Sequence, residues 1–235
     1  MRQPSRLQAF FFDAGNTLLR INYADVTAHL SGLGIRAAPE AVERAEYQAR
    51  VKLDPHLAPG ASTEDRMVFR LYVGYLLEAL GITDEATVSD VYQWVRGYNP
   101  PVGLWNQADS TAAPLLDRLR AEGYRLGVIS NSNGSVRSIL EETGLARRLD
   151  FILDSAVVGV EKPDPRIFTM ALEAAGVPPE KAAYVGDLYS VDVLGSRKVG
   201  MTGVLLDPGG VWNHVDCPKA PTLRAAIDLA LSGSE

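Results

Sequence analysis

Short apolar stretches alternate with longer amphipathic stretches through most of the second half of the chain. Such apolar runs predict strands buried on both faces of a parallel sheet, and the amphipathic stretches between them predict crossover helices. The expected strands are 125–130, 151–154, 183–186 and 202–206, and the expected helices are 112–122, 136–142, 165–175, 192–199 and 223–231. From about residue 104 onward, the pattern therefore predicts a βαβ arrangement.

The first part of the chain has a different pattern. The apolar run Phe10–Phe12 predicts one more buried strand, which ends at Asp13 before a Gly-Asn turn. From about residue 22 to 100 there are few strand signals, and Gly- and Pro-containing breaks separate helical stretches. The expected helices are 23–30, 39–51, 63–80 and 85–96.

These patterns predict an α/β protein with a Rossmann-like parallel sheet that a helical insert interrupts after the first strand. We expect residues 1–20 and 101–235 to form the core and residues 21–100 to form the insert. The segment from Pro100 to Gly103 has the composition of a linker and marks the expected return to the core.

Composition narrows the classes of partner and the compartment. The 235 residues carry a net charge of −6 without any block of Lys or Arg, which argues against nucleic acid and anionic membrane surfaces as partners. No apolar stretch approaches the roughly 18 residues of a transmembrane helix. The one cysteine, Cys217, excludes an internal disulfide and is typical of a reducing compartment. The sequence thus predicts a cytoplasmic protein; it does not predict an oligomeric state.

Polar residues follow the predicted strands at four places. Asp13 follows the first strand, Ser130 and Asn131 end the next, Lys162 precedes the helix at 165–175, and an acidic pair follows the strand at 183–186. This pair is Asp187 and Asp192. Open α/β sheets bind ligands at the carboxyl ends of their strands, so we expect these side chains to meet in one site.

The four segments resemble, in order, the four motifs of the haloacid dehalogenase (HAD) superfamily. They are residues 13–17 (DAGNT), 126–134 (LGVISNSNG), 158–168 (VGVEKPDPRIF) and 182–196 (AAYVGDLYSVDVLGS). The helical insert resembles the C1-type cap of that superfamily in position and length. The resemblance covers essentially the whole chain and implies a hydrolase acting on a small phosphorylated molecule through an aspartyl-phosphate.

The resemblance also implies a role for each site residue. Asp13 is the expected nucleophile, Ser130 and Asn131 hold the phosphoryl group, and Lys162 clamps it. Asp13, the Gly15 carbonyl, Asp187 and Asp192 (the last directly or through a water) are the expected Mg²⁺ site. Three carboxylates balanced by Mg²⁺ and one lysine give a nearly neutral site that accepts a dianionic phosphate.

One residue departs from the motif. The superfamily usually has a second aspartate, the general acid, where this chain has Gly15. General acid–base catalysis contributes typically ~10²–10⁴-fold, so esters of poor leaving groups should react slowly unless another donor serves. Aryl and acyl phosphates should be affected less. The possible donors in the insert are His29, His56, Glu64, Asp65, Tyr72 and Tyr98.

Three alternatives stay open. Loss of the acid also fits a weakly active or non-catalytic regulatory protein. A small residue at position 15 together with Lys52 in the insert is a feature of phosphonate-cleaving members, in which a cap lysine forms a Schiff base. Haloacid hydrolysis is disfavoured, because such members need no metal and generally lack the pair Gly186-Asp187 that is present here.

Overall fold

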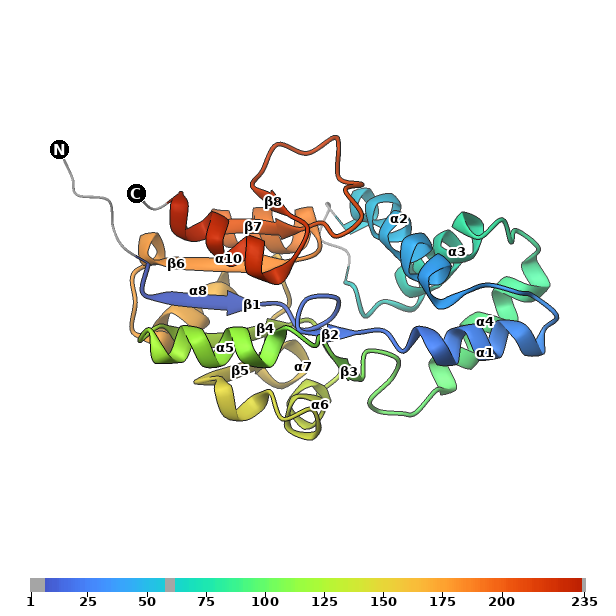
Figure 1. Cartoon of the computed structure of the whole chain (residues 1–235), viewed down its shortest axis with the longest axis horizontal. Coiled ribbons are helices and arrows are strands. Elements are labelled where there is room, and N and C mark those ends of the chain that lie inside the picture. The colour runs from blue at the N-terminus through green and yellow to red at the C-terminus, as the bar shows by residue number, and fades with distance from the viewer. Residues whose placement is uncertain (1–6, 58–61, 234–235) are drawn as a thin grey trace.

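The centre of the molecule is a six-stranded sheet in which all neighbouring strands are parallel (Figure 1). The computed structural model describes residues 7–57 and 62–233. The strands are β1 (Ala9–Phe12), β4 (Arg125–Ser130), β5 (Phe151–Asp154), β6 (Ala182–Gly186), β7 (Thr202–Leu206) and β8 (Lys219–Ala220). They lie in the order β5-β4-β1-β6-β7-β8, which confirms the predicted Rossmann-like class.

Helices cover both faces of this sheet because successive side chains of each strand point to opposite faces. Phe10 and Phe12 pack against one group of helices, and Phe11 packs against the other face. The first group is α5 (Ala112–Ala121), α6 (Val136–Glu142) and α10 (Leu223–Ser232). The opposite face is covered by α8 (Pro165–Ala175). β1, with all its residues buried, is thus the middle of the core.

Four helices between β1 and α5 pack around a separate hydrophobic cluster. We call them the helical insert: α1 (Tyr23–Gly32), α2 (Pro39–Leu57), α3 (Arg66–Ala79) and α4 (Glu85–Gly97). The chain enters and leaves the insert through β2 (Leu19–Arg20) and β3 (Gln107–Ala108), which pair antiparallel. In Figure 1 the insert lies beyond the end of the sheet at which the β1 arrow points. Among the described helices, none combines the length and the apolar composition needed to span a bilayer.

Several helix ends differ from the predicted ones. α3 begins at Arg66 instead of residue 63, because the Asp65 side chain accepts hydrogen bonds from the N–H groups of Met67 and Val68 and caps the helix. α2 continues to Leu57, beyond the predicted end at residue 51, because Leu53 and Leu57 are buried in the core of the insert. Apolar packing here outweighs Pro55 inside the helix.

The predicted helix 192–199 is wrong in its first part. A π-helical turn at Tyr189–Val193 comes first, and α9 (Leu194–Lys198) follows. The turn forms because Asp192 accepts hydrogen bonds from the backbone N–H groups of Asp187 and Leu188 before it. The short elements α7 (Ser155–Val158), β2, β3 and β8 were not predicted, since two to four residues are too few for a periodic pattern.

Candidate active site

The candidate site lies where β4, β1 and β6 end side by side. Asp13 follows β1, Ser130 is the last residue of β4, and Asp187 follows β6. Because β1 pairs in parallel with both β4 and β6, the carboxyl ends of these three strands lie at the same edge of the sheet. Lys162 joins them from the loop before α8. The structure therefore brings together the residues that the four sequence segments predicted to meet.

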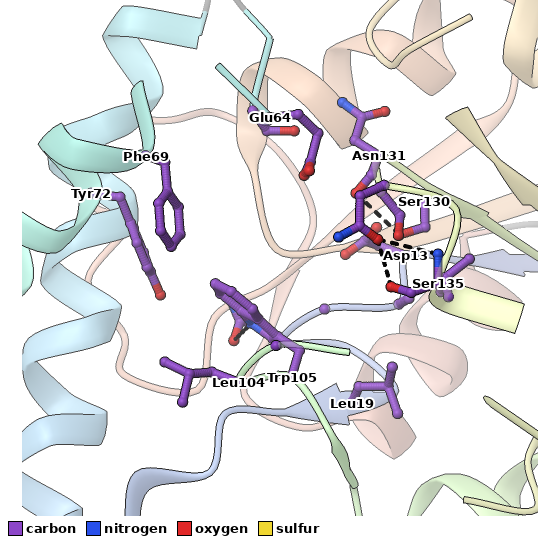
Figure 2. Close-up of a pocket in the computed structure, with 18 of the residues that line it drawn as sticks. Asp13, Leu19, Glu64, Phe69, Tyr72, Leu104, Trp105, Ser130, Asn131 and Ser135 are labelled. Carbon is purple, nitrogen blue, oxygen red and sulfur yellow. Dashed lines mark hydrogen bonds between the residues drawn. The ribbon is translucent and has the colours of Figure 1, made fainter. Parts of the chain in front are cut away.

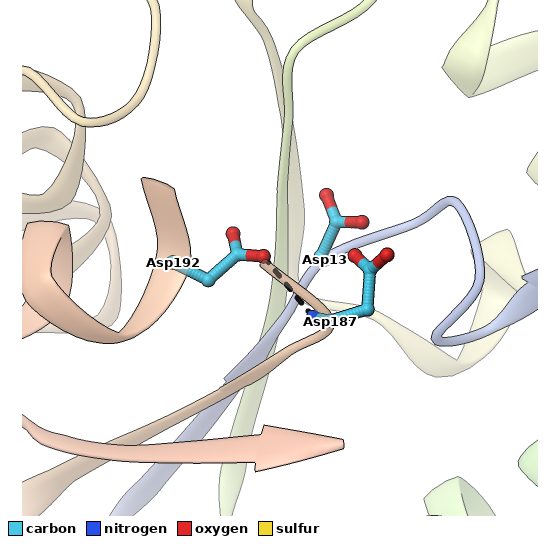
Figure 3. A group of neighbouring side chains, drawn as sticks. All are labelled: Asp13, Asp187 and Asp192. Carbon is cyan, nitrogen blue, oxygen red and sulfur yellow. Dashed lines mark hydrogen bonds between the residues drawn. The ribbon is translucent and has the colours of Figure 1, made fainter. Parts of the chain in front are cut away.

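Three buried carboxylates form a cluster at this edge (Figure 3). Asp13, Asp187 and Asp192 each offer an oxygen, and the three oxygens lie within 4.8 Å of one another. Burial raises the pKa of Asp13 to about 7; the charge of Lys162 opposes this rise, and the charges of Asp192 and Asp187 add to it. A buried set of oxygen ligands with excess negative charge fits a hard divalent cation such as Mg²⁺.

Lys162 connects two of these carboxylates. Its Nζ donates hydrogen bonds to Asp13 Oδ1 at 2.6 Å, to Asp192 Oδ1 at 2.8 Å and to the Tyr184 hydroxyl at 3.0 Å. The side chain is buried, and the neighbouring negative charges of Asp13 and Asp192 raise the pKa of Lys162 despite the opposing effect of burial. The ammonium group thus stays charged beside Asp13. Tyr184, which sequence reasoning missed, points toward Lys162 from the middle of β6.

Asp192 holds the loop after β6 in place. Its Oδ2 accepts the backbone N–H groups of Asp187 at 3.1 Å and Leu188 at 3.0 Å, while its Oδ1 accepts Lys162. The carboxylate occupies the space beside Gly186, where an added Cβ would lie 2.4 Å from Asp192 Cγ. The observed reason for glycine is that the Asp192 carboxylate needs this space.

The Ser130–Asn131 segment lines the cavity above Asp13. Ser130 is buried, and its hydroxyl makes only a long hydrogen bond of 3.4 Å to the Asn131 carbonyl. The Asn131 side chain bonds the backbone of Lys162 twice, donating to its carbonyl at 2.9 Å and accepting from its N–H at 2.8 Å. The Asn131 carboxamide therefore fixes the Lys162 loop, whereas the Ser130 hydroxyl is free to contact a ligand.

Trp105 fills the space next to Gly15. A Cβ at position 15 would lie 3.3 Å from Trp105 Cδ1, which is tighter than an ordinary contact. The indole N–H donates to Asn16 Oδ1 at 3.0 Å, and Asn16 has the left-handed backbone, with φ of 53°. The ring therefore occupies the space into which the usual acid of the superfamily would extend. Gly15 leaves room for the Trp105 ring to pack there.

The helical insert contributes a buried ion pair that the sequence patterns missed. Arg50 on α2 donates to Asp187 Oδ2 at 3.1 Å, and its Nε lies 2.9 Å from Glu46 Oε1. Glu46 also accepts from the Tyr72 hydroxyl at 2.9 Å and from Asn16 Nδ2 at 3.2 Å. A signal was present, since Glu46 and Arg50 stand four residues apart on the apolar face of α2.

A cavity of about 470 Å³ lies between the sheet edge and the insert (Figure 2). Of the six predicted donors, Glu64, Tyr72 and Tyr98 line it, whereas His29, His56 and Asp65 are outside its described lining. The hydroxyls of Tyr72 and Tyr98 already bond Glu46 and Asp25. Figure 2 shows the Glu64 side chain to the left of Asn131, on the side of the insert. The pKa of Glu64 is raised to about 7, mostly by desolvation and in part by the negative charges of Glu161 and Asp154.

Lys52 lies away from the cavity. Its ammonium group bonds Glu78 on the surface of the insert at 2.6 Å, and its side chain is 51% exposed. The described lining of the cavity does not include it. The geometry therefore gives no support to a Schiff base formed by Lys52.

Comparison with known proteins identifies the family. Residues 7–200 match haloacid dehalogenase-like hydrolases. The human haloacid dehalogenase-like hydrolase domain-containing protein 3 is 32% identical over 213 residues, which cover 88% of this chain and 84% of the human protein. The chain therefore belongs to the haloacid dehalogenase-like hydrolases.

One further relative and one solved structure are also similar to this chain. Phosphoserine phosphatase from Thermus thermophilus is 42% identical over 114 residues, covering 48% of this chain and 45% of that enzyme. An L-2-haloacid dehalogenase of known structure aligns with a TM-score of 0.62 and 22% identity over 98% of this chain and all of its own. At that identity the likeness shows the fold alone, so the reaction has to be argued from the residues of the site.

Proposed function

We propose that this hydrolase is a Mg²⁺-dependent phosphohydrolase of a small phosphorylated molecule. The observation that carries the proposal is the buried cluster in which Lys162 Nζ lies 2.6 Å from Asp13 Oδ1 and two further carboxylates stand close by. Phosphoryl transfer needs a positioned nucleophile, a divalent cation and fixed positive charge. The phosphatase among the relatives adds support for this class of reaction.

The proposed metal site uses Asp13, the Gly15 carbonyl and Asp187, with Asp192 holding the loop that carries Asp187. A glycine still offers its carbonyl, so the substitution at position 15 spares this ligand. When bound, Mg²⁺ supplies charge neutralisation at the phosphoryl oxygens. Few protein ligands and several waters are typical for this ion.

In the proposed reaction, an Asp13 carboxylate oxygen attacks phosphorus while the bond from phosphorus to the ester oxygen breaks. The leaving group departs as an anion or takes a proton from a donor. Water then attacks the phosphorus of the aspartyl-phosphate, which releases inorganic phosphate and restores the Asp13 carboxylate. Lys162 and the Ser130 hydroxyl hold the phosphoryl oxygens, and Tyr184 and Asp192 keep Lys162 aimed at Asp13.

We further propose that residues 21–100 act as a C1-type cap over a core of residues 1–20 and 101–235, of which residues 1–6, 58–61 and 234–235 lie outside the described part. The cap would exclude water and select the leaving group. Glu64 is our candidate for the proton donor that replaces the acid missing at Gly15, because it lines the cavity and its carboxyl has no hydrogen-bond partner among the described residues.

The rival proposal is a weakly active or regulatory protein. Its support is the absence of an acid at Gly15. The free-energy cost of burying Asp13, Asp187, Asp192 and Glu46 around Lys162 and Arg50 argues for a working site. Haloacid hydrolysis remains disfavoured because a metal-binding carboxylate at Asp187 has no part in it.

Hydrolysis of an aryl phosphate with and without Mg²⁺ tests the proposal. We expect Mg²⁺-dependent turnover that Asp13→Asn abolishes, because the amide is a poor nucleophile. Asp228→Asn, at an exposed carboxylate on α10, is the matched control and should keep full activity. Folded protein without metal-dependent turnover would favour the regulatory protein, and an Asp13→Asn variant as active as the control would exclude Asp13 as the nucleophile.

A further inference from the structure

One wall of the cavity is a row of aromatic rings from the insert and the segment that follows it. The Tyr72 ring lies 6.0 Å from that of Trp105 at an interplanar angle of 33°, and the Phe69 ring lies 6.2 Å from that of Tyr72 at 26°. All three residues line the cavity. Figure 2 shows them across the open space from Asp13, Ser130 and Asn131. We call Phe69, Tyr72 and Trp105 the aromatic wall.

Hydrogen bonds at their edges fix two of these rings. The Trp105 indole donates to Asn16 Oδ1 at 3.0 Å, and the Tyr72 hydroxyl donates to Glu46 Oε1 at 2.9 Å. The polar atom of each ring thus bonds within the protein, and the apolar part of each side chain lines the cavity. A wall held in this way loses little conformational entropy when it binds a flat group.

The position of the aromatic wall predicts that it contacts the leaving group of a substrate. Attacking and leaving oxygens stand roughly in line at phosphorus. A leaving group opposite Asp13 therefore extends away from the sheet edge and toward the insert, where the wall stands. Leu19 and Leu104 extend this apolar side of the cavity. The wall itself carries no charge, so it favours an uncharged flat ring.

We propose that the substrate is a phosphate monoester whose leaving group carries a flat aromatic ring that stacks on the aromatic wall. The inference rests on the proposed phosphohydrolase function and names its substrate class. An observation at position 15 agrees with it: Gly15 provides no acid beside Asp13, and an aryl oxide depends less than an alkoxide on a donor such as Glu64. Trp105 connects the two observations, because it covers Gly15 and forms part of the wall.

Binding of two phosphonates, which are not hydrolysed, tests the inference by calorimetry in the presence of Mg²⁺. Benzylphosphonate carries a ring and ethylphosphonate does not. We expect benzylphosphonate to bind the unaltered protein at least about tenfold more tightly, because ring contacts add to the burial of apolar area. Equal affinities would overturn the inference.

Three variants test whether the aromatic wall causes the preference for benzylphosphonate. We expect Phe69→Leu and Trp105→Leu each to reduce the ratio of the two affinities by about 3- to 10-fold. Trp94→Leu is the matched control; Trp94 stacks on His29 within the insert and is absent from the described lining of the cavity. Because the ratio is taken within each variant, partial loss of folded protein cancels. A ratio unchanged in both wall variants, or reduced equally in the control, would contradict stacking on the wall.

Turnover of acetyl phosphate separates this inference from the proposed function. That substrate has no ring and a leaving group that needs no proton. Mg²⁺-dependent turnover of acetyl phosphate without any preference for ring-bearing ligands would overturn the substrate class alone. Absence of turnover for acetyl and aryl phosphates alike would overturn the phosphohydrolase itself.

Discussion

At Asp13, burial and the charge of Lys162 shift the pKa in opposite directions. Desolvation raises its pKa to about 7, although Lys162 donates a hydrogen bond to it at 2.6 Å. An ordinary aspartate is ionised above about pH 4, whereas Asp13 keeps its proton in the metal-free protein up to about pH 7. A metal ion must displace that proton before Asp13 can ligate it.

Mg²⁺ affinity should therefore fall as the pH drops below about 7, by up to about tenfold per pH unit if one proton is released. Calorimetry at pH 6, 7 and 8, in buffers of different ionisation enthalpy, measures the affinity and the protons released. Asp13→Asn should bind the ion weakly and with less proton release, because burial also raises the pKa of Asp187. Affinity constant across this range would show that Asp13 is already ionised in the metal-free protein.

Gly15→Asp tests the missing acid at the position where the superfamily usually has it. We expect the variant to accelerate hydrolysis of alkyl phosphates more than that of aryl phosphates, since only poor leaving groups need the proton. The new side chain meets Trp105 Cδ1, so the gain should be larger in the double variant with Trp105→Ala. An equal gain for both ester classes would refute the missing-acid interpretation.

Glu64→Gln tests the proposed donor in the insert. With a pKa of about 7, Glu64 is partly protonated at neutral pH and can give up a proton. The amide cannot, so alkyl phosphate turnover should fall by ~10²-fold while aryl phosphate turnover changes little. The high-pH limb of the rate profile for alkyl esters should disappear as well. A uniform loss for both ester classes would instead indicate a role in binding.

At the level of elements, α2 connects the insert to the sheet edge. Glu46, Arg50 and Asp54 recur every four residues on its buried side. Arg50 bonds Asp187, and Asp54 Oδ1 accepts from the backbone N–H of Ser190 at 2.9 Å and from its hydroxyl at 2.8 Å. A single helix thus positions two parts of the loop after β6.

Arg50→Met should destabilise the metal-free protein by roughly 3–5 kcal/mol, because it leaves Glu46 and Asp187 buried without their cation. Replacing both charges, as in Glu46→Leu with Arg50→Met, should cost less than the sum of the two single changes. Urea unfolding measures each value. Lys52→Met is the control on the same helix, since its partner Glu78 is about half-exposed, and it should cost at most about 1 kcal/mol.

The sequence patterns predicted some of the helices and strands accurately and missed others. The strands at 125–130, 151–154 and 202–206 were predicted to the residue, because each contains a short apolar run with a polar residue at one or both of its ends. The π-helical turn before α9 was missed because side-chain hydrogen bonds of Asp192, and not periodicity, determine it. The ion pair of Glu46 and Arg50 was missed for a related reason: on a helix surface, charged residues predict solvent contact unless the partner is known.

For the whole molecule, the site lies where the core meets the insert. The sheet buries a hydrophobic cluster on each of its faces, and α1–α4 bury a separate one. Polar contacts such as Arg50–Asp187 and Asp54–Ser190 join the insert to the loops of the core. Apolar packing of Val191 and Trp105 on the insert, and of Val51 on the core, adds to them. A ligand that neutralises the carboxylates should therefore stabilise the two parts together.

Mg²⁺ together with inorganic phosphate should raise the melting temperature. At one hundred times the dissociation constant the expected gain is about 2.7 kcal/mol. Calorimetric melting with and without a chelator measures it. Asp187→Asn should lose most of this gain, whereas Asp228→Asn should keep it. A gain of the same size in Asp187→Asn would place the ion elsewhere.

The sequence by itself determined the fold class and the set of reactive residues. Buried strands of a parallel sheet are apolar throughout, and the polar residue that ends such a strand is conspicuous. Tertiary structure decided how these residues divide the work: Asp192 and Asn131 hold loops, Arg50 and Glu46 enter from the insert, and Trp105 covers Gly15. These contacts join residues up to 137 positions apart. No local pattern encodes them, because the packing of the insert against the sheet edge is what brings them together.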